Sequence, residues 1–341
     1  MEIRDKEHKI IEEFGIRHTK WDTKKLSEFI YILNTHPWLP SSFVNIKDEN
    51  KRTALIFASK FSDLHTYSTE ETVRMLLGAG ANTDIQDIFG LTALMLASKF
   101  SNTLSSEGTV RMLLGAGANP DIQDTDGDTA LMYASINSNI KSTEGTVRML
   151  LGAGANPDIQ NNYGHTALMC ASERSNKIST EETVKMLLDA GANPDIQDND
   201  GKTALIYASI NSNITSTEGT VKMLLDAGAN PDIQDQNGYT ALIFASKYSN
   251  TNSTEETVNM LLDAGANTDI QNDFGKTALI YASEHLNTYS TEGTVRMLLD
   301  ARADPYIQDI YGRTALLYAY KYSETHSTEG TVEMLLDSGV K

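Results

Sequence analysis

Histidine, cysteine and serine side chains are the groups of this chain that could act as metal ligands or nucleophiles. The seven histidines are scattered, and none stands at metal-ligand spacing from a cysteine, aspartate or glutamate. The single cysteine, Cys170, rules out an internal disulfide, and its position favours a small buried apolar residue over a catalytic thiol. No Ser/His/Asp or Cys/His set is discernible. We therefore predict a protein that is not an enzyme and has no catalytic, cofactor or metal site.

Two recurring strings could be mistaken for ligand-binding loops. Gly-Ala-Gly-Ala-Asn occurs at 78–82, 115–119 and 152–156, but each copy ends an apolar helical pattern and so cannot cradle phosphate as a P-loop does. Asp-Ile-Gln-Asp, as at 84–87, carries carboxylates that could ligate calcium. Because it recurs beside every turn, we interpret it as a source of turn hydrogen bonds.

The elements that carry these residues are copies of one unit. The triplet Thr-Ala-Leu occurs eight times, and after a first interval of 39 residues every interval is 37. The copies begin at Thr53, Thr92, Thr129, Thr166, Thr203, Thr240, Thr277 and Thr314. A fixed period of this length indicates a supersecondary unit that stacks on its neighbours, rather than one globular core.

One copy shows the expected order of elements. Residues 124–128 contain Asp-Gly and predict a tight turn. Thr129 then suits the N-cap of a short apolar helix, and residues 142–144 suit the N-cap of a second helix. Gly154 suits the left-handed residue that ends that helix. The unit is therefore a hairpin, a helix, a loop, a second helix and a turn.

These strings resemble a known repeat. Asp-x-x-Gly-x-Thr-Ala-Leu-x-x-Ala-Ser and Val-x-Met-Leu-Leu-x-Ala-Gly-Ala-Asn-Pro are similar to the ankyrin repeat over residues 45–341. The resemblance implies an all-α repeat solenoid of ankyrin-type helix pairs with β-hairpin or turn fingers, in eight repeats of period 37. The near-identical copies also resemble ankyrin proteins of large DNA viruses of amoebae, which would place the protein in the host cell cytoplasm.

Several positions depart from the family pattern. The period is 37 rather than about 33, and the extra residues fall between the two helices, as at 103–106 and 177–180. Their polar composition predicts a solvent loop. Lys51 replaces a turn glycine, so we expect a distorted first hairpin, and Arg302 replaces a helix-ending glycine, at a cost of about 1 kcal/mol if it stays left-handed. The recurring methionine of the second helix, as at Met149, is predicted to fill the core.

The ends of the array should differ from its interior, because terminal repeats have one neighbour. Residues 1–44 are predicted to form a degenerate capping repeat. Its first helix would carry Ile3, Ile10, Ile11 and Phe14, and its second Leu26, Phe29, Ile30 and Leu33. A rival interpretation is an F-box, since Trp38-Leu39-Pro40 resembles its start, but too few residues follow for that domain's helices. At the other end, the sequence stops at Lys341, and we expect no ligase-recruiting extension.

Composition bounds the partner. The formal net charge is −18, which repels phosphate backbones and argues against nucleic acid. No apolar run approaches the roughly 20 residues that span a bilayer, and the N-terminus lacks a secretory signal pattern. We expect a cytoplasmic monomer that binds a protein partner, neutral or basic, and neither nucleic acid nor membrane.

The positions that differ between copies are candidates for recognition. They gather at the hairpin tips and at the end of each first helix, which in the resembled family line one concave groove. Aromatic residues beside charges are typical of interface hot spots, and they fall in repeat two and repeats six to eight. The predicted partner-binding residues are Ile88, Phe89, Leu91, Phe100, Tyr163, Tyr239, Tyr248, Phe274, Lys276, Tyr311, Arg313 and Tyr322.

Two functions remain open at this point. The first is a non-catalytic protein–protein interaction scaffold, and the alternative is a substrate-recruiting adaptor subunit of a ubiquitin ligase. A separate structural alternative is that the exposed aromatic residues only pack on the adjacent tips.

Overall fold

The computed structural model describes residues 20–36, 39–62, 70–284, 289–321 and 329–338. The chain divides into two compact units, 1–162 and 163–341, which are treated one at a time. The described residues form eighteen helices and no strand. The fingers expected as hairpins are therefore turns without assigned strands in this part of the chain.

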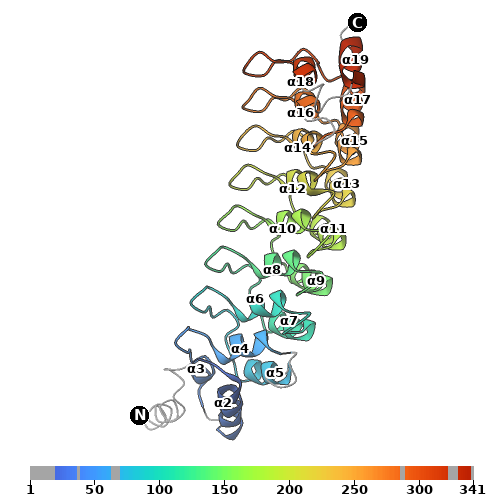
Figure 1. Ribbon diagram of the computed structural model, residues 1–341. Coiled ribbons are helices and arrows are strands. Elements are labelled where there is room, and N and C mark those ends of the chain that lie inside the picture. The colour runs from blue at the N-terminus through green and yellow to red at the C-terminus, as the bar shows by residue number, and fades with distance from the viewer. Residues whose placement is uncertain (1–19, 37–38, 63–69, 285–288, 322–328, 339–341) are drawn as a thin grey trace. The chain divides into compact units, whose positions relative to one another are not determined.

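The first unit begins with two unpaired helices, and three helix pairs follow. Within the pairs, α4, α6 and α8 pack side by side as one row, and α5, α7 and α9 form a second row (Figure 1). Its helices are α2 (Thr23–Thr35), α3 (Ser41–Val44), α4 (Ala54–Lys60), α5 (Glu70–Gly78), α6 (Ala93–Lys99), α7 (Glu107–Gly115), α8 (Ala130–Ile136) and α9 (Glu144–Gly152).

The second unit consists of five helix pairs with the same arrangement. The first helix of each pair (α10, α12, α14, α16 and α18) belongs to one row, and the second helix of each pair (α11, α13, α15, α17 and α19) belongs to the other. Its helices are α10 (Ala167–Glu173), α11 (Glu181–Asp189), α12 (Ala204–Asn211), α13 (Glu218–Asp226), α14 (Ala241–Lys247), α15 (Glu255–Asp263), α16 (Ala278–Glu284), α17 (Glu292–Asp300), α18 (Ala315–Lys321) and α19 (Glu329–Ser338). Both units are all-helical repeat stacks, which confirms the predicted solenoid class.

The helix ends follow the sequence signals. The Thr129 hydroxyl accepts a hydrogen bond from Met132 N at 3.3 Å, and Thr143 caps the second helix through Thr146 N at 3.0 Å. Gly154 has φ +86° and ends α9 in the left-handed region. Arg302 adopts φ +66° at the equivalent position, so the predicted strain is present.

The first finger is not distorted, contrary to our expectation for Lys51. Lys51 adopts φ +58°, in the region that the glycines of the other fingers occupy. Asp48 N donates to Arg52 O at 2.9 Å and Lys51 N donates to Asp48 O at 2.9 Å. The same pair of bonds closes the glycine-containing finger at Asp124. These hydrogen bonds hold a lysine in a conformation that is costly for it but accessible.

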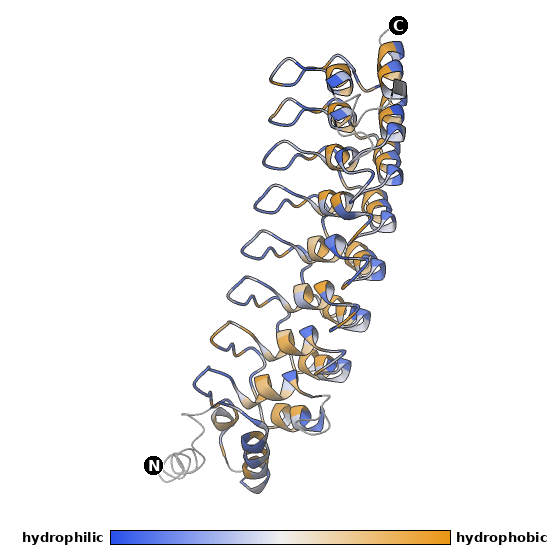
Figure 2. Ribbon diagram, viewed as in Figure 1, coloured by the Kyte–Doolittle hydropathy of each residue, from blue (hydrophilic) through white to orange (hydrophobic). Residues whose placement is uncertain are grey.

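Burial on two sides explains the composition of each helix pair. In α8, Ala130, Leu131 and Met132 are almost fully buried, and in α9 Val147 and Leu150 are. These apolar faces meet between the two rows of helices, where Figure 2 shows the hydrophobic colouring concentrated. Each buried aliphatic side chain contributes about 1.5–3 kcal/mol, so the packing of repeats on one another stabilises the stack.

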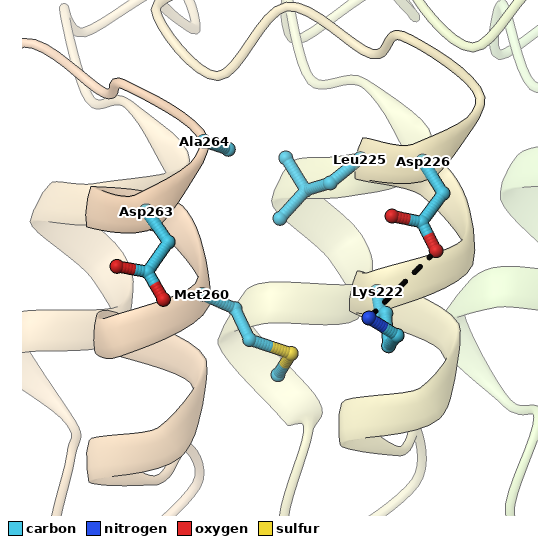
Figure 3. Close-up of a pocket in the computed structure, with 6 residues that line it drawn as sticks. All are labelled: Lys222, Leu225, Asp226, Met260, Asp263 and Ala264. Carbon is cyan, nitrogen blue, oxygen red and sulfur yellow. Dashed lines mark ion pairs between the residues drawn. The ribbon is translucent and has the colours of Figure 1, made fainter.

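Contrary to our prediction, most methionines of the second helices are not core residues. Only Met186 among them is buried, while Met149 and the others are half-buried. Figure 3 shows one example, where Met260 of α15 faces Leu225 and Lys222 of α13 across an open groove of about 360 Å³.

The inter-helix segments are also more buried than a solvent loop. In the second unit, Ser216 and Thr220 are fully buried and Ser175 nearly so. Ser175 Oγ lies 2.6 Å from Thr220 Oγ1 and 3.2 Å from Ser216 Oγ, which joins one repeat to the next. The extra residues therefore add a ladder of hydroxyl hydrogen bonds between repeats. Equivalent pairs occur at Ser62–Ser105, Ser101–Ser142, Ser212–Ser253 and Ser249–Ser290.

The N-terminal segment covers the first repeat. Leu26, Phe29 and Ile32 are the buried residues of α2, whereas the predicted Ile30 and Leu33 are half-buried. Trp21 ties this segment to the first finger, donating from N to Asp48 Oδ2 at 3.0 Å and from Nε1 to Arg52 O at 2.8 Å. The predicted first cap helix lies outside the described residues, and the boundary at residue 44 stays a prediction.

The hydroxyl ladder leads to a stability prediction. The substitution Thr220→Val keeps the shape of the side chain but removes the nearer of the two hydroxyl partners of Ser175, so it should lower the free energy of unfolding by about 1–2 kcal/mol. Thr251→Val is the matched control, since that half-buried hydroxyl makes only a 3.4 Å bond within its own loop. Urea unfolding followed by circular dichroism measures both. Equal stabilities of the two variants would contradict a structural role for the ladder.

Candidate functional site

In each unit, one surface combines the finger tips with the C-terminal ends of the first helices. We call it the finger face of that unit. In Figure 1 the fingers project from the row of first helices, away from the row of second helices. The sequence-predicted partner-binding residues that the structure describes all lie at these two kinds of position.

Backbone hydrogen bonds hold the finger tips to one another. In the first unit, Thr125 N donates to Phe89 O at 3.0 Å and Asn162 N donates to Asp126 O at 3.0 Å. The approach is so close that a Cβ added to Gly127 would lie 2.7 Å from Asn162 N. Because backbone atoms make these ties, the tip side chains can vary without loosening the fingers.

A carboxylate at the base of the finger holds its turn. Asp124 Oδ1 accepts from the backbone N–H groups of Asp126 and Asp128, each at 2.9 Å. Its second oxygen, Oδ2, accepts the hydroxyl of Tyr133 from the following helix at 2.6 Å. The aspartate thus connects the finger to the first helix of its own repeat.

The partner of the second carboxylate oxygen differs between repeats. Asp198 Oδ2 accepts Tyr207 OH at 2.5 Å and lies 3.3 Å from His165 Nε2, which comes from the preceding finger. In repeat two, Leu96 offers no hydroxyl, and Asp87 Oδ2 accepts Arg52 Nε of the preceding finger at 3.3 Å.

The last repeat shows that one oxygen can accept a tyrosine hydroxyl and an arginine at once, here an arginine of the same finger. Asp309 Oδ2 accepts Tyr318 OH at 2.7 Å and also the Arg313 guanidinium, at 3.0 Å from Nε and 2.9 Å from Nη2. Burial raises the pKa of the Asp309 carboxyl, but these hydrogen bonds and those from the finger backbone outweigh it and bring the pKa to about 2. Burial, followed by the hydrogen bond to Asp309, raises the pKa of the Tyr318 phenol.

The first-unit patch consists of Ile88, Phe89, Leu91 and Phe100. Ile88 is 43% exposed and Phe89 52%, while Leu91 and Phe100 are half-buried. The ammonium groups of Lys60 and Lys99 lie 5.6 Å and 5.9 Å from the Phe100 ring centroid. The structure thus exposes two apolar side chains at this finger tip, and it places two cations beside the ring of Phe100, which the sequence had not predicted.

A cavity of about 180 Å³ opens beside this patch. Leu91 and Lys60 both form part of its wall. Burial, and secondarily the neighbouring Arg52, lowers the pKa of the Lys60 ammonium. The cavity is lined by Arg52, Ile56, Phe57, Lys60, Phe61, Asp87, Leu91 and Leu96. Its wall is therefore mainly apolar, with one carboxylate and two cations.

The second-unit patch divides into exposed and packed residues. Phe274 and Tyr311 are 48% and 71% exposed, and Arg313 lies 4.5 Å from the Tyr311 ring centroid. Tyr163, at the first finger of this unit, is 63% exposed. Tyr248 is half-buried, and Tyr322 lies outside the described residues.

Two of the predicted residues are engaged within the stack. The Tyr239 ring stacks on Phe244 with centroids 4.8 Å apart, and its hydroxyl lies 2.7 Å from Tyr281 OH. Lys276 Nζ pairs with Glu284 at 2.6 Å. For Tyr239, packing on neighbouring repeats is therefore the better interpretation.

The predicted partner-binding set omits several exposed residues, and the sequence interpretation overlooked one set of internal tyrosines. Ile310 is 59% exposed at the same tip as Tyr311, and Tyr306 is 64% exposed. The change at residue 306 was visible in the sequence, because Tyr306 replaces the aspartate of the other linkers. The tyrosines that reach the finger aspartates had been treated only as helix positions.

Other chemistry finds no support among the described residues. They contain no group of three or more His, Cys, Asp or Glu side chains that could hold a metal ion. No described helix is long and apolar enough to cross a membrane. The groove in Figure 3 lies between second helices, and its Lys222–Asp226 ion pair spans 3.9 Å. Similar side chains recur there in other repeats, so it follows from stacking rather than from a distinct site.

The pKa of Asp309 leads to a pH prediction. Because its folded value of about 2 lies below the ordinary 3.8, the carboxylate stabilises the fold above about pH 4, and this contribution is lost as the pH falls toward 2. Asp309→Asn should therefore lose less stability than the wild type over this window, measured by guanidinium unfolding. Asp263→Asn, an exposed site, controls for removing one charge. Parallel losses in wild type and Asp309→Asn would refute the assignment.

Comparisons with known proteins agree with this geometry. The family model "Ankyrin repeats (3 copies)" matches residues 64–144, 103–198, 140–232, 177–255, 213–309 and 250–341. Among 594 matching chains of solved structures is the ankyrin repeat domain of Bcl-3, described as a unique member of the IkappaB protein family. The match has 26% sequence identity and a TM-score of 0.59, and it covers 74% of this chain and 100% of that domain. The comparison with curated proteins found no match. The protein is therefore a member of the ankyrin repeat family.

Proposed function

We propose that this protein is a non-catalytic scaffold that binds a protein partner through its finger faces. Ankyrin repeats form a protein–protein interaction fold that is typically non-catalytic, which supports the class of function. The observation that carries the proposal is the exposure of Ile88, Phe89, Phe274 and Tyr311 at finger tips. Large apolar side chains held in this way are suited to become the buried anchors of an interface.

Rigid presentation supports this role. The tip backbones are tied to one another, as in the 3.1 Å bond from Ile310 N to Phe274 O. Gln271 reinforces the same finger, because its Nε2 donates to Gln308 O at 2.9 Å in the next repeat. A surface ordered in this way loses little conformational entropy when a partner binds, and affinity gains accordingly.

Charge favours a neutral or basic partner. The chain carries a formal net charge of −18, and the finger tips of repeats three and five include the exposed Asp126 and Asp200. Acidic rims attract a basic surface and repel an acidic one, which affects association rate and specificity more than affinity.

The first-unit patch yields a binding prediction. The probe is the most abundant protein captured from a cell lysate by the immobilised wild-type chain. The double substitution Phe89→Ala, Leu91→Ala removes an exposed anchor and its half-buried neighbour, so it should weaken binding of that protein about tenfold or more. Interferometry measures the affinity, and the thermal midpoint should fall by no more than about 2 °C.

A matched control tests whether the loss of affinity depends on where the apolar side chain lies, and not only on removing an exposed apolar side chain. Ile140 is 48% exposed in the same unit but lies in an inter-helix segment rather than on the finger face. Ile140→Ala should leave the affinity unchanged. Wild-type affinity in the Phe89/Leu91 variant, or an equal loss in Ile140→Ala, would be incompatible with binding at this patch. Cullin-adaptor proteins in the captured material would instead favour the ubiquitin ligase alternative.

A further inference from the structure

The cavity beside the first-unit patch is lined in part by Leu96, which stands where several other repeats carry a tyrosine. It lies next to Leu96 and Asp87 and between the first helices of repeats one and two. Residues at the position of Leu96 in later repeats include Tyr133, Tyr207 and Tyr318. Their surroundings show what this position accepts when an aromatic ring is present.

Tyr207 gives the nearest comparison. Its hydroxyl donates to Asp198, the counterpart of Asp87, at 2.5 Å. Its ring centroid lies 5.6 Å from that of His165, which stands at the position of Arg52. The carboxylate and the neighbour from the preceding finger thus border both the tyrosine and the cavity.

Two further tyrosines complete the comparison. Lys99, the counterpart of Lys60, lies 4.3 Å from the Tyr133 ring centroid. Tyr318 donates to Asp309 Oδ2 while the same oxygen also accepts the Arg313 guanidinium. An arginine on this carboxylate therefore does not prevent a phenol from binding it.

Repeat two has every part of this environment except the phenol. Asp87 is 5% exposed, and its Oδ2 accepts Arg52 Nε at 3.3 Å. Lys60 forms another part of the wall. Leu96 is 7% exposed, and its side chain has no hydroxyl to donate to the carboxylate as a tyrosine does. The volume of about 180 Å³ suffices for one ring, since an apolar cavity of roughly 150 Å³ holds benzene.

We propose that this cavity is a socket for a tyrosine side chain of the protein partner, with the phenol hydroxyl donating to Asp87. This deepens the proposed function and rests on it. The alternatives fit less well. Lysine or arginine would meet the cations Arg52 and Lys60. A carboxylate or a phosphotyrosine carries no hydroxyl proton to donate to Asp87 at neutral pH, and phenylalanine would also leave this carboxylate without the new donor. The exposed Phe89 next to the socket would contact residues that flank the inserted tyrosine.

The probe for the test is p-cresol, which has the ring and hydroxyl of tyrosine. Methyl NMR of the full chain should show shifts at Ile56 and Leu91, which line the cavity, on addition of p-cresol. Toluene lacks the hydroxyl and should bind about tenfold more weakly, because it cannot donate to the carboxylate.

Substitutions that fill the cavity complete the test. Leu96→Tyr supplies the missing phenol from within the chain, so it should abolish these shifts and raise the thermal midpoint by about 2–4 °C. Leu96→Phe should also abolish the shifts, as it fills the cavity with a residue that repeats one and six already carry at Phe57 and Phe244. Phe244→Tyr is the matched control and should leave p-cresol binding at the socket unchanged.

The outcomes separate the socket from the scaffold function. Persistent shifts in both Leu96 variants, or equal binding of toluene, would overturn the socket. If the captured partner binds Leu96→Tyr as well as it binds the wild type, the socket fails while the scaffold function stands. If p-cresol binds as described but no protein is captured by the wild-type chain, the scaffold function fails instead. Loss of the partner in Leu96→Tyr, with binding retained in Phe244→Tyr, supports both.

Discussion

The finger carboxylate imposes a constraint on the rest of each repeat. One of its oxygens accepts two backbone N–H groups and so fixes the turn, as Asp124 does for the third finger. The other oxygen points toward the first helix, where a buried charge needs a donor. In repeats two and five, a residue of the preceding finger contacts this oxygen, and in repeat five a tyrosine of the first helix does so as well. This links the geometry of the finger to the chemistry of the surface beside it.

Different repeats meet the constraint in different ways, and this gives near-identical copies distinct surfaces. In repeat seven, Asn272 replaces the aspartate, and its Nδ2 donates to Tyr281 OH at 2.9 Å. In repeat two, an arginine from the preceding finger neutralises Asp87 and an adjacent space stays open. The residues that contact the finger carboxylate, or the asparagine that replaces it, thus differ between repeats, as the tip residues do. A partner meets these differences as local pockets and charges on a rigid backbone.

The sequence predicted the features that depend on local order. The period, the threonine N-caps and the glycine at the end of the second helix each follow from nearby residues, and the structure confirms them. Interactions between repeats were harder to predict. The serines of the inter-helix segment look like loop residues, but Ser175 and Ser216 are buried because they bond each other 41 residues apart. Lys51 shows that backbone hydrogen bonds can impose a glycine conformation on another residue.

The sequence predicted which positions lie at the finger tips, but it did not predict which of those side chains are exposed and which are packed. Tip residues such as Phe89 and Tyr311 are exposed, as their variability suggested. Tyr239 occupies a similar sequence position, yet it packs on Phe244 and Tyr281. Which case applies depends on the residue that the next first helix places opposite, 42 positions away in the case of Tyr281. The cavity at Leu96 could not be predicted from the sequence for the same reason, because residues from two repeats form its wall.

We propose that the finger face binds protein segments and that repeat two selects a tyrosine. A selection of random displayed peptides on the immobilised full chain, run in parallel with the Leu96→Tyr variant, tests both proposals. Peptides enriched on the wild type should share a tyrosine and lose binding to the variant. Enriched peptides without tyrosine, or peptides that bind the two proteins equally, would contradict these proposals.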